Sequence, residues 1–316
     1  MVYRHVAAVA TLGLALAGCQ SGALTPQVQR GLWTFRSSQG TTLTTPKYQI
    51  FTTCRDSALL DALPRILEGA AKAYAQLVPA NPPLDRRMQT YLFANRAQWE
   101  AFTRDFAGAR APTYLMIRSG GYEEDGVAVA YYTRRADTLS VVTHEGFHQY
   151  LSATQRRHVP AWLNEGLACY FESFEMDGDG WPVFKPRDNR LRLPHLRDAV
   201  QAGRLYPLPE LLSIDAGHAV SSGEERTRTY YAQLWALTLF LLEPDRVNPD
   251  AAGFRRMLAE LGTEQMRLRG QGVQLAAAAA DRVPPPEEAV FRYYITHDLD
   301  GFSRRFEAYA RKLAGL

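Results

Sequence analysis

The sequence feature that most constrains the fold and chemistry of this chain is a short motif with two histidines, followed 17 residues later by an acid. The motif is His-Glu-Gly-Phe-His at residues 144–148, and Glu165 follows 17 residues after the second histidine. Because residues four apart lie on one face of an α-helix, His144 and His148 can bind one metal ion. Zinc takes about four tetrahedral ligands, and a catalytic site leaves one of them to water. The pattern therefore predicts one zinc ion per chain, with His144, His148 and Glu165 as its ligands.

Glu145 is the residue of this motif that can act as a general base. It lies beside His144 on the helix but is not needed as a ligand, so its carboxylate is free to accept a proton. The alternative is a plain amphipathic helix whose histidines are surface residues or hydrogen-bonded core residues. Apolar side chains on both sides of the motif favour a buried metal-binding helix, and these are Val141, Val142, Tyr150 and Leu151.

Two further segments give the chain a resemblance to a known superfamily. With the Trp-Leu-Asn-Glu-Gly run at residues 162–166, the motif resembles the gluzincin zinc metallopeptidases, which include thermolysin and the aminopeptidases related to leukotriene A4 hydrolase. Residues 231–241 resemble the helix in which those enzymes carry an oxyanion-stabilising tyrosine. The resemblance implies peptide-bond hydrolysis, a zincin-like fold and this role for Tyr231, with Tyr230 as the competing choice. The layout is closest to small bacterial peptidase-MA-like families of unknown function.

The N-terminus predicts export and a lipid anchor. Residues 6–17 form an apolar run that is too short to span a bilayer as a stable helix. The run ends in Leu-Ala-Gly-Cys at residues 16–19, which resembles a bacterial lipoprotein signal. The resemblance implies cleavage before Cys19, lipidation of Cys19 and, because Gln20 follows, location in the outer membrane facing the periplasm. An ordinary signal peptide with an incidental cysteine is the alternative.

Three polar or sulfur-containing side chains have open roles. Glu172 lies seven residues after Glu165, and we expect it either to accept a hydrogen bond from a zinc-binding histidine or to end a buried face. In an oxidising periplasm Cys54 and Cys169 could form a disulfide. A small buried thiol at Cys169 is the equal alternative.

The order of predicted elements indicates an α+β fold. β-Branched and aromatic runs predict strands, and capping residues predict the starts of helices. The expected strands span residues 48–53, 89–93 and 126–132, and the expected helices run from Asp56 or Ser57 to Val78, from Asn95 to Phe106, and through most of the chain after Asp137. This order fits a small mixed sheet that packs against a helical lobe.

The predicted domain organisation follows from these elements. Residues 1–18 are a lipoprotein signal peptide, and residues 19–45 are a tether with room for one short strand. Residues 46–316 form one zincin-like metallopeptidase domain, with an α/β lobe at 46–135 and a helical lobe at 136–316. The active site is expected in the cleft between the lobes. By the same resemblance, the strand at 126–132 is the edge along which an extended peptide lies.

Charge and motif together limit the function classes. The formal net charge is +3, which gives no electrostatic footprint for nucleic acid. We therefore expect a zinc-dependent peptidase of the bacterial cell envelope, with a peptide or protein substrate and a membrane contact through its lipid. A catalytically inactive, zinc-containing lipoprotein that acts as a binding or assembly factor is the alternative. Glu145 favours the enzyme, because a structural zinc site needs no base.

Overall fold

The computed structural model describes residues 26–118, 120–244, 248–278 and 282–316, and a six-stranded sheet organises its N-terminal half. The strand order is β1-β2-β3-β4-β6-β5, with β3, β4 and β6 parallel and the other pairs antiparallel. The strands are β1 (Gln29–Phe35), β2 (Ser38–Thr44), β3 (Tyr48–Thr52), β4 (Met88–Phe93), β5 (Gly121–Glu124) and β6 (Val127–Tyr131). The mixed sheet expected from the sequence is confirmed.

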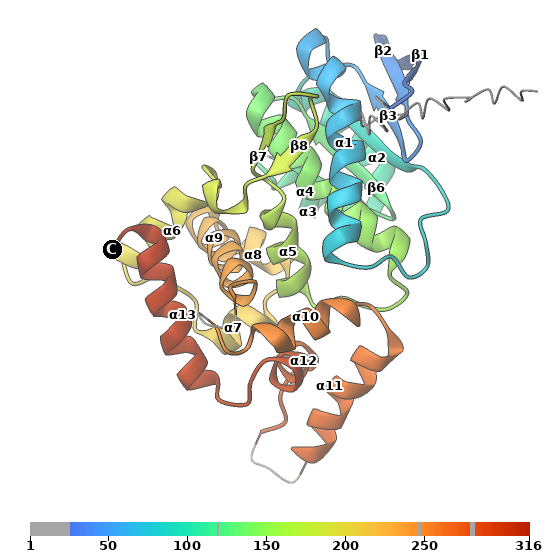
Figure 1. Ribbon diagram of the computed structural model, residues 1–316. Coiled ribbons are helices and arrows are strands. Elements are labelled where there is room, and N and C mark those ends of the chain that lie inside the picture. The colour runs from blue at the N-terminus through green and yellow to red at the C-terminus, as the bar shows by residue number, and fades with distance from the viewer. Residues whose placement is uncertain (1–25, 119, 245–247, 279–281) are drawn as a thin grey trace, which may run out of the picture.

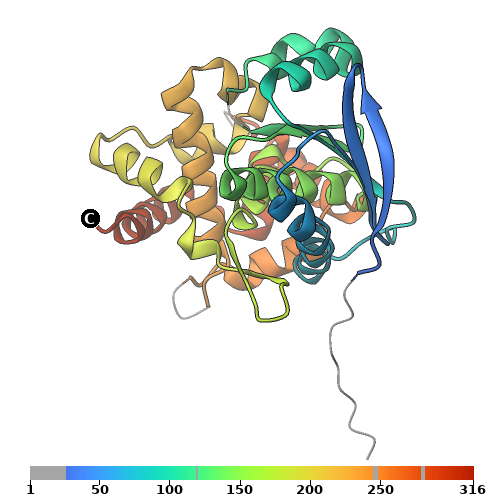
Figure 2. The same cartoon turned by 90° about the horizontal axis from the view of Figure 1, so that it is seen from above.

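Helices cover both faces of this sheet (Figures 1 and 2). On one face lie α1 (Ser57–Leu77) and α4 (Arg135–Thr154), and on the other lie α2 (Arg96–Ala107), the 3₁₀ turn η1 (Gly108–Arg110) and α3 (Ala111–Leu115). Strand residues alternate between these faces, as a pleated strand requires: Leu92 joins the α1–α4 core, whereas Phe93 packs with Trp99 of α2.

The C-terminal half is mainly helical, which confirms the α+β prediction. Its elements in chain order are α5 (Ala161–Tyr170), the hairpin of β7 (Phe174–Met176) and β8 (Pro182–Phe184), the 3₁₀ turn η2 (Pro186–Asp188), α6 (Arg192–Gln201), α7 (Leu208–Ser213), α8 (Ala216–Ser221), α9 (Glu224–Leu241), α10 (Ala251–Ala259), α11 (Glu264–Ala276), α12 (Pro286–Tyr294) and α13 (Leu299–Ala314). Within the described ranges, no helix combines the length and apolar character that crossing a membrane requires.

Two of the predicted helices begin where their capping residues place them. The Asp56 side chain accepts a hydrogen bond from the Leu59 N–H at the start of α1. The Asn95 side chain accepts one from the Gln98 N–H at the start of α2. Each bond satisfies a backbone donor that has no partner within the helix, so local sequence alone fixes these boundaries.

The predicted tether is wrong over residues 29–44, because these residues form the β1–β2 hairpin. Trp33 and Phe35 on β1 pack on Phe93 of β4, with ring centroids 6.1 and 4.9 Å apart. Leu43 on β2 is fully buried in the main core. These apolar contacts outweigh the polar composition of the segment. The signal peptide, Cys19 and the start of the tether lie outside the described residues.

The predicted edge strand is also wrong, because β6 is paired on both sides and β5 forms the edge. A two-residue turn joins β5 to β6, with φ of 51° at Asp125 and 82° at Gly126. Positive φ at both central residues matches the tight turn that Asp-Gly favours in hairpins. This turn adds the strand Gly121–Glu124 outside the strand that the sequence predicted.

Helix α4 lies at the junction of the two halves. It packs against α1, β5 and β6 on the sheet side and against α5 of the helical half. The small residues Ala128 and Ala130 of β6 face this side of the sheet, where Ala130 joins the same core as Phe147 of α4. The helix that carries the His-Glu-Gly-Phe-His motif is therefore held by both halves.

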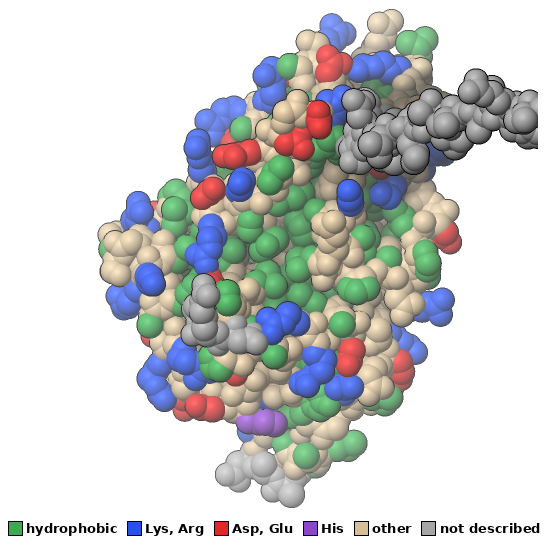
Figure 3. Space-filling model, viewed as in Figure 1, with side chains coloured by type: hydrophobic (Ala, Val, Ile, Leu, Met, Phe, Trp, Pro, Cys, Tyr) green, Lys and Arg blue, Asp and Glu red, His purple; other side chains and the backbone are tan. Residues whose placement is uncertain are grey.

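The face shown in Figure 3 carries charges of both signs. Its Lys and Arg side chains are spread around the margin among Asp and Glu, with apolar side chains toward the middle. This distribution is that of an ordinary mixed surface.

Candidate metal centre and cleft

The structure brings the three predicted ligands together at one buried point. The Nε2 atoms of His144 and His148, both on α4, lie 3.4 and 3.5 Å from Oε2 of Glu165 on α5. All three side chains are buried, and their ligand atoms lie within 4.8 Å of one another. Tetrahedral zinc with bonds of about 2.0–2.2 Å places neighbouring ligand atoms about 3.3–3.6 Å apart. The spacing around Glu165 therefore fits one zinc-sized ion.

The opposite ring nitrogens fix the direction in which the histidines point. Nδ1 of His144 lies 2.9 Å from Oε1 of Glu172, and Nδ1 of His148 lies 2.8 Å from Oδ1 of Asn164. Because these oxygens accept, each Nδ1 can donate its proton to them, which leaves Nε2 of each ring, on the side of Glu165, as the atom available to a metal. Oε2 of Glu165 is buried and has no hydrogen-bond partner. Three lone pairs thus meet at a point where a cation would satisfy all of them.

The same centre favours positive charge electrostatically. Burial acts to lower the pKa of His144, but contacts with Cys169, Glu165 and Glu172 raise it well above its ordinary value. Burial acts to raise the pKa of Glu165, but the charges and close contacts of the two histidines lower it far below its usual range. These buried groups could hold a metal ion.

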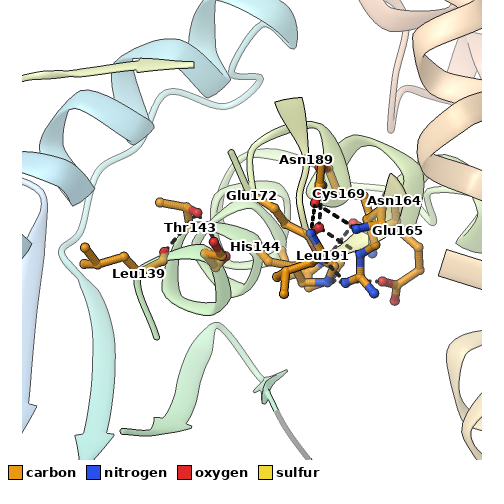
Figure 4. A network of polar contacts seen from close by, with 12 residues as sticks. Leu139, Thr143, His144, Asn164, Glu165, Cys169, Glu172, Asn189 and Leu191 are labelled. Carbon is orange, nitrogen blue, oxygen red and sulfur yellow. Dashed lines mark hydrogen bonds and ion pairs between the residues drawn. The ribbon is translucent and has the colours of Figure 1, made fainter. Parts of the chain in front are cut away.

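A charged network stands behind His144 (Figure 4). Glu172 accepts hydrogen bonds from Nε of Arg192 and from Nδ2 of Asn189, each at 2.8 Å, while it accepts from His144. Burial acts to raise the pKa of Glu172, but Arg192 and His144 lower it to about 2. Of the two roles open for Glu172, the geometry matches the hydrogen-bond acceptor. Sequence reasoning missed Arg192 and Asn189, because neither belongs to a recognisable motif.

Glu145 lies beside the ligands and carries no such partner. Among the described residues, none forms a hydrogen bond or an ion pair with its carboxylate, and the residue as a whole is 7% exposed. Burial raises the pKa of Glu145, the nearby Glu165 and Glu123 raise it further, and the two histidines oppose the shift. A carboxylate with a raised pKa and no fixed partner suits proton transfer.

A glycine lets the sheet edge approach Glu145. A Cβ on Gly121 of β5 would lie 3.1 Å from Cγ of Glu145 and 2.8 Å from the Val129 carbonyl oxygen. Only glycine therefore fits here without displacing a neighbour. Strand β5 consequently runs close beside the carboxylate of Glu145.

The two adjacent tyrosines of α9 face different surroundings. The ring of Tyr231 lies 6.1 Å from that of His144 and lines the cleft described below, with the Arg192 guanidinium 4.8 Å from its centroid. The Tyr230 hydroxyl instead donates to the Ile214 carbonyl oxygen at 3.1 Å within the core. The structure thus turns Tyr231, and not Tyr230, toward His144 of the candidate metal centre.

Close packing of α5 against α9 brings Tyr231 near Glu165. A Cβ on Gly166 would lie 2.3 Å from Oγ1 of Thr238 and 3.1 Å from the Leu234 carbonyl oxygen, so a larger residue would force the helices apart. The glycine that follows Glu165 is therefore a contact point between the helix that carries the ligand and the helix that carries the tyrosine.

A cleft of about 740 Å³ opens over this centre between the two halves of the molecule. His144, Glu145, Glu172 and Tyr231 line it, whereas His148 and Glu165 are not among its lining residues. The sheet half contributes residues 115–118 and Gly121, and the helical half contributes residues of α6 and α9. A site in a cleft between the two lobes is what the sequence predicted.

A second group of metal-binding side chains shares His144. His144, Cys169 and Glu172 also lie within ligand distance of one another. Cys54 and Cys169 are both free thiols, so the structure has no disulfide between them. Glu172 already neutralises Arg192, and burial raises the pKa of the Cys169 thiol. The group with Glu165 is therefore the better site for a divalent cation.

One comparison with known proteins matches the part of the chain that contains this centre. A DUF1570 domain, described as a protein of unknown function, is found over residues 138–256. That range contains all the residues placed at the centre from His144 to Tyr231. Neither a curated protein nor a solved structure matches the chain.

Proposed function

We propose that the protein is a zinc-dependent peptidase of the bacterial cell envelope. The observation that carries the proposal is the meeting of three lone pairs, from His144, His148 and Glu165, beside the unpaired carboxylate of Glu145 on a cleft. A purely structural zinc site closes all four positions with protein ligands and needs no base. The three-ligand arrangement with an adjacent free acid favours hydrolysis.

The roles of the side chains follow from where they lie. Zinc bound by the three ligands would polarise a substrate carbonyl group and lower the pKa of a water molecule. Glu145 would accept the proton of the attacking water and deliver it to the leaving amine. The Tyr231 hydroxyl would donate a hydrogen bond to the developing oxyanion. Glu172 and Asn164 would hold the imidazoles in the tautomer that presents Nε2 to the metal.

The substrate would bind as an added strand. β5 is the edge of the sheet, and its first residue, Gly121, lies against Glu145 and lines the cleft. An extended peptide that pairs with β5 would pass beside the base and gain affinity from main-chain hydrogen bonds. This proposal moves the predicted substrate edge from residues 126–132 to β5.

Location in the envelope is proposed from the sequence. The Leu-Ala-Gly-Cys run supports lipidation of Cys19, which would tether the protein to the outer membrane on its periplasmic side. One acyl chain binds membranes only marginally, so stable anchoring implies more than one. Labelling with a fatty acid that is lost in Cys19→Ala would support the anchor, and an unlabelled wild-type protein would refute it.

The decisive experiment measures zinc and peptide cleavage on the purified chain from residue 19 with Cys19 replaced. We expect about one zinc per chain, lost in His148→Ala. Glu145→Gln keeps the side-chain shape and should retain zinc, while cleavage of a peptide library falls by about 10²–10⁴-fold. Cleavage that survives Glu145→Gln undiminished would contradict the mechanism. Zinc binding without any cleavage by the wild type would favour a binding lipoprotein.

The tyrosines provide a matched pair of variants. Tyr231→Phe should slow cleavage by about 10–10³-fold, because the metal would still stabilise the oxyanion. Tyr230→Phe removes a buried hydroxyl that donates to the Ile214 carbonyl oxygen and does not line the cleft, so it should leave the rate close to that of the wild type. Equal effects of the two variants would argue against an oxyanion role for Tyr231.

A further inference from the structure

One part of the cleft lining carries an excess of positive charge. It consists of residues of α6 and α9 and of the loop at residues 115–118, which faces them across the cleft. Arg118 and Arg228 line this part of the cleft beside His195, and we refer to the two arginines as the cationic wall. We propose that the cationic wall binds a carboxylate of the substrate, supplied by an acidic side chain or by a free C-terminus. The inference rests on the proposed peptidase function and names a substrate class for it.

Two guanidinium groups of the wall share one acid. Glu224, the first residue of α9, accepts from Nη1 of Arg118 at 2.6 Å and also from Arg228. Two positive charges and one negative charge leave one positive charge in excess. Each guanidinium has five N–H donors, so donors remain for a second carboxylate. The side chains of Arg118 and Arg228 are 80% and 53% exposed, which leaves them accessible from the cleft.

The position of Glu224 shows that a carboxylate fits between these arginines. Glu224 on α9 pairs with Arg118 on the sheet half, so this ion pair connects the two sides of the cleft. A substrate carboxylate could bind beside Glu224 or replace it. Such bonds to planar guanidinium groups are the strongest and most directional that a peptide carboxylate can form.

The backbone around the wall is fixed and adds to the attraction. The carbonyl oxygen of Arg118 accepts from Nη1 of Arg96 at 3.1 Å and from the Tyr131 hydroxyl at 2.5 Å, which holds the loop in place. At the other side, α9 begins after Gly223, which lines the cleft and offers no side-chain cap. The positive end of this helix therefore also faces the cleft.

His195 adds a further hydrogen-bond donor beside the two arginines. It lies one turn after Arg192 on α6, and none of the described residues forms a hydrogen bond or ion pair with it. Burial lowers its pKa, and the charges of Arg228 and Arg192 lower it further. His195 is therefore neutral near pH 7 and can donate to an arriving carboxylate without adding to the charge.

The test compares matched peptides that differ in one charge. Each position of a cleaved peptide is changed between Glu and Gln, and the C-terminus between acid and amide, which separates the two sources of the carboxylate. In the wild type, we expect kcat/KM to favour the acidic form by about 10-fold or more at one of these positions, mainly through KM. Equal rates, or preference for the neutral form at every position, would overturn the proposal while leaving the peptidase function intact.

Three variants locate the effect. Arg228→Gln should reduce the preference for the acidic peptide to near one, and Glu224→Gln should increase it, because both arginines then lose their internal partner. Arg226→Gln is the matched control, since Arg226 lies on the same helix but bonds to Glu210 and is not among the lining residues of the cleft. An equal loss of preference in Arg226→Gln would overturn the assignment to the cationic wall.

A binding measurement separates failure of this inference from failure of the proposed function. If the wild type cleaves no peptide, the peptidase proposal fails, and fluorescence anisotropy with zinc-loaded Glu145→Gln then tests the wall directly. Tighter binding of labelled acidic peptides than of their amide counterparts, weakened by salt and by Arg228→Gln, would support the wall. Equal binding of both peptides would overturn it.

Discussion

The two histidines of the candidate metal centre are held from behind by groups of different charge. On the His144 side stands a buried carboxylate, Glu172, which is itself neutralised by Arg192. On the His148 side stands a neutral amide, Asn164, which comes from the same helix as Glu165. Both imidazole rings are therefore oriented by a hydrogen bond at Nδ1, but the acceptor is a buried charged group for His144 and a neutral group for His148.

This difference predicts on which side a substitution lowers the free energy of unfolding least. A buried ion pair contributes little net stability as long as it is intact, but removal of one partner leaves an uncompensated charge in the interior. Removal of one partner of a neutral hydrogen bond leaves no buried charge, and the loss of the bond costs only about 0.5–1.5 kcal/mol of stability. We therefore expect changes on the His144 side to lower both metal affinity and the stability of the whole fold strongly, and changes on the His148 side to affect mainly metal affinity, with a smaller effect on stability.

The largest expected effect is that of Glu172→Gln. Glutamine can still accept from Nδ1 of His144, but Arg192, whose side chain is only 18% exposed, loses its counter-charge. The free energy of unfolding should fall by about 3–5 kcal/mol. Zinc affinity should fall by about 10–100-fold, since a carboxylate behind a ligating histidine raises its basicity. Urea unfolding and competition with a zinc chelator measure the two effects.

Restoration of the charge balance gives the control for this prediction. In the double variant Glu172→Gln with Arg192→Met, no unpaired charge remains, so most of the lost stability should return while the zinc affinity stays low. A double variant as unstable as Glu172→Gln alone would show that packing, and not charge, dominates the His144 side.

An intermediate effect on stability is expected when the group behind His148 is changed to a carboxylate, as is found behind His144. Asn164→Asp places a carboxylate behind His148, next to Glu165 and without an arginine partner. The zinc-free protein should lose about 1–3 kcal/mol, whereas the zinc-bound protein should recover that loss because the second carboxylate strengthens the ligand. Unfolding with and without zinc should therefore differ more in this variant than in the wild type. Equal differences would remove the proposed contrast between the two sides.

Sequence alone predicted the parts of the site that lie along one helix. The spacing of His144 and His148 on α4 and the caps of α1 and α2 depend on neighbours within four residues, and the structure has them where expected. The approach of Glu165 on α5 to this pair is a contact between two helices, which the sequence predicted from the motif and its resemblance to a known superfamily rather than from local periodicity. Local periodicity is sufficient for such features, because helix geometry fixes which side chains share a face.

Features created by distant contacts could not be predicted. The β1–β2 hairpin depends on Trp33 and Phe35 meeting Phe93 across the sheet, and nothing in its own polar sequence shows this. The edge strand β5 was missed although Asp125 and Gly126 form a recognisable hairpin turn. Arg192 on α6 reaches Glu172, which follows α5, because α5 and α6 both pack on α9, and this packing is a property of the tertiary fold.

The smallest expected effect is that of Cys169→Ala, and it decides between the two groups that share His144. Cys169 is fully buried, and burial raises the pKa of its thiol, so the neutral thiol is a poor ligand. Loss of one sulfur atom from the core should cost about 1 kcal/mol. Zinc content should stay at that of the wild type, while His148→Ala abolishes it, and the cobalt-substituted protein should lack an intense near-ultraviolet thiolate band. Metal lost in Cys169→Ala but retained in His148→Ala would move the ion to the group of His144, Cys169 and Glu172, where Arg192 would compete with it for the same carboxylate.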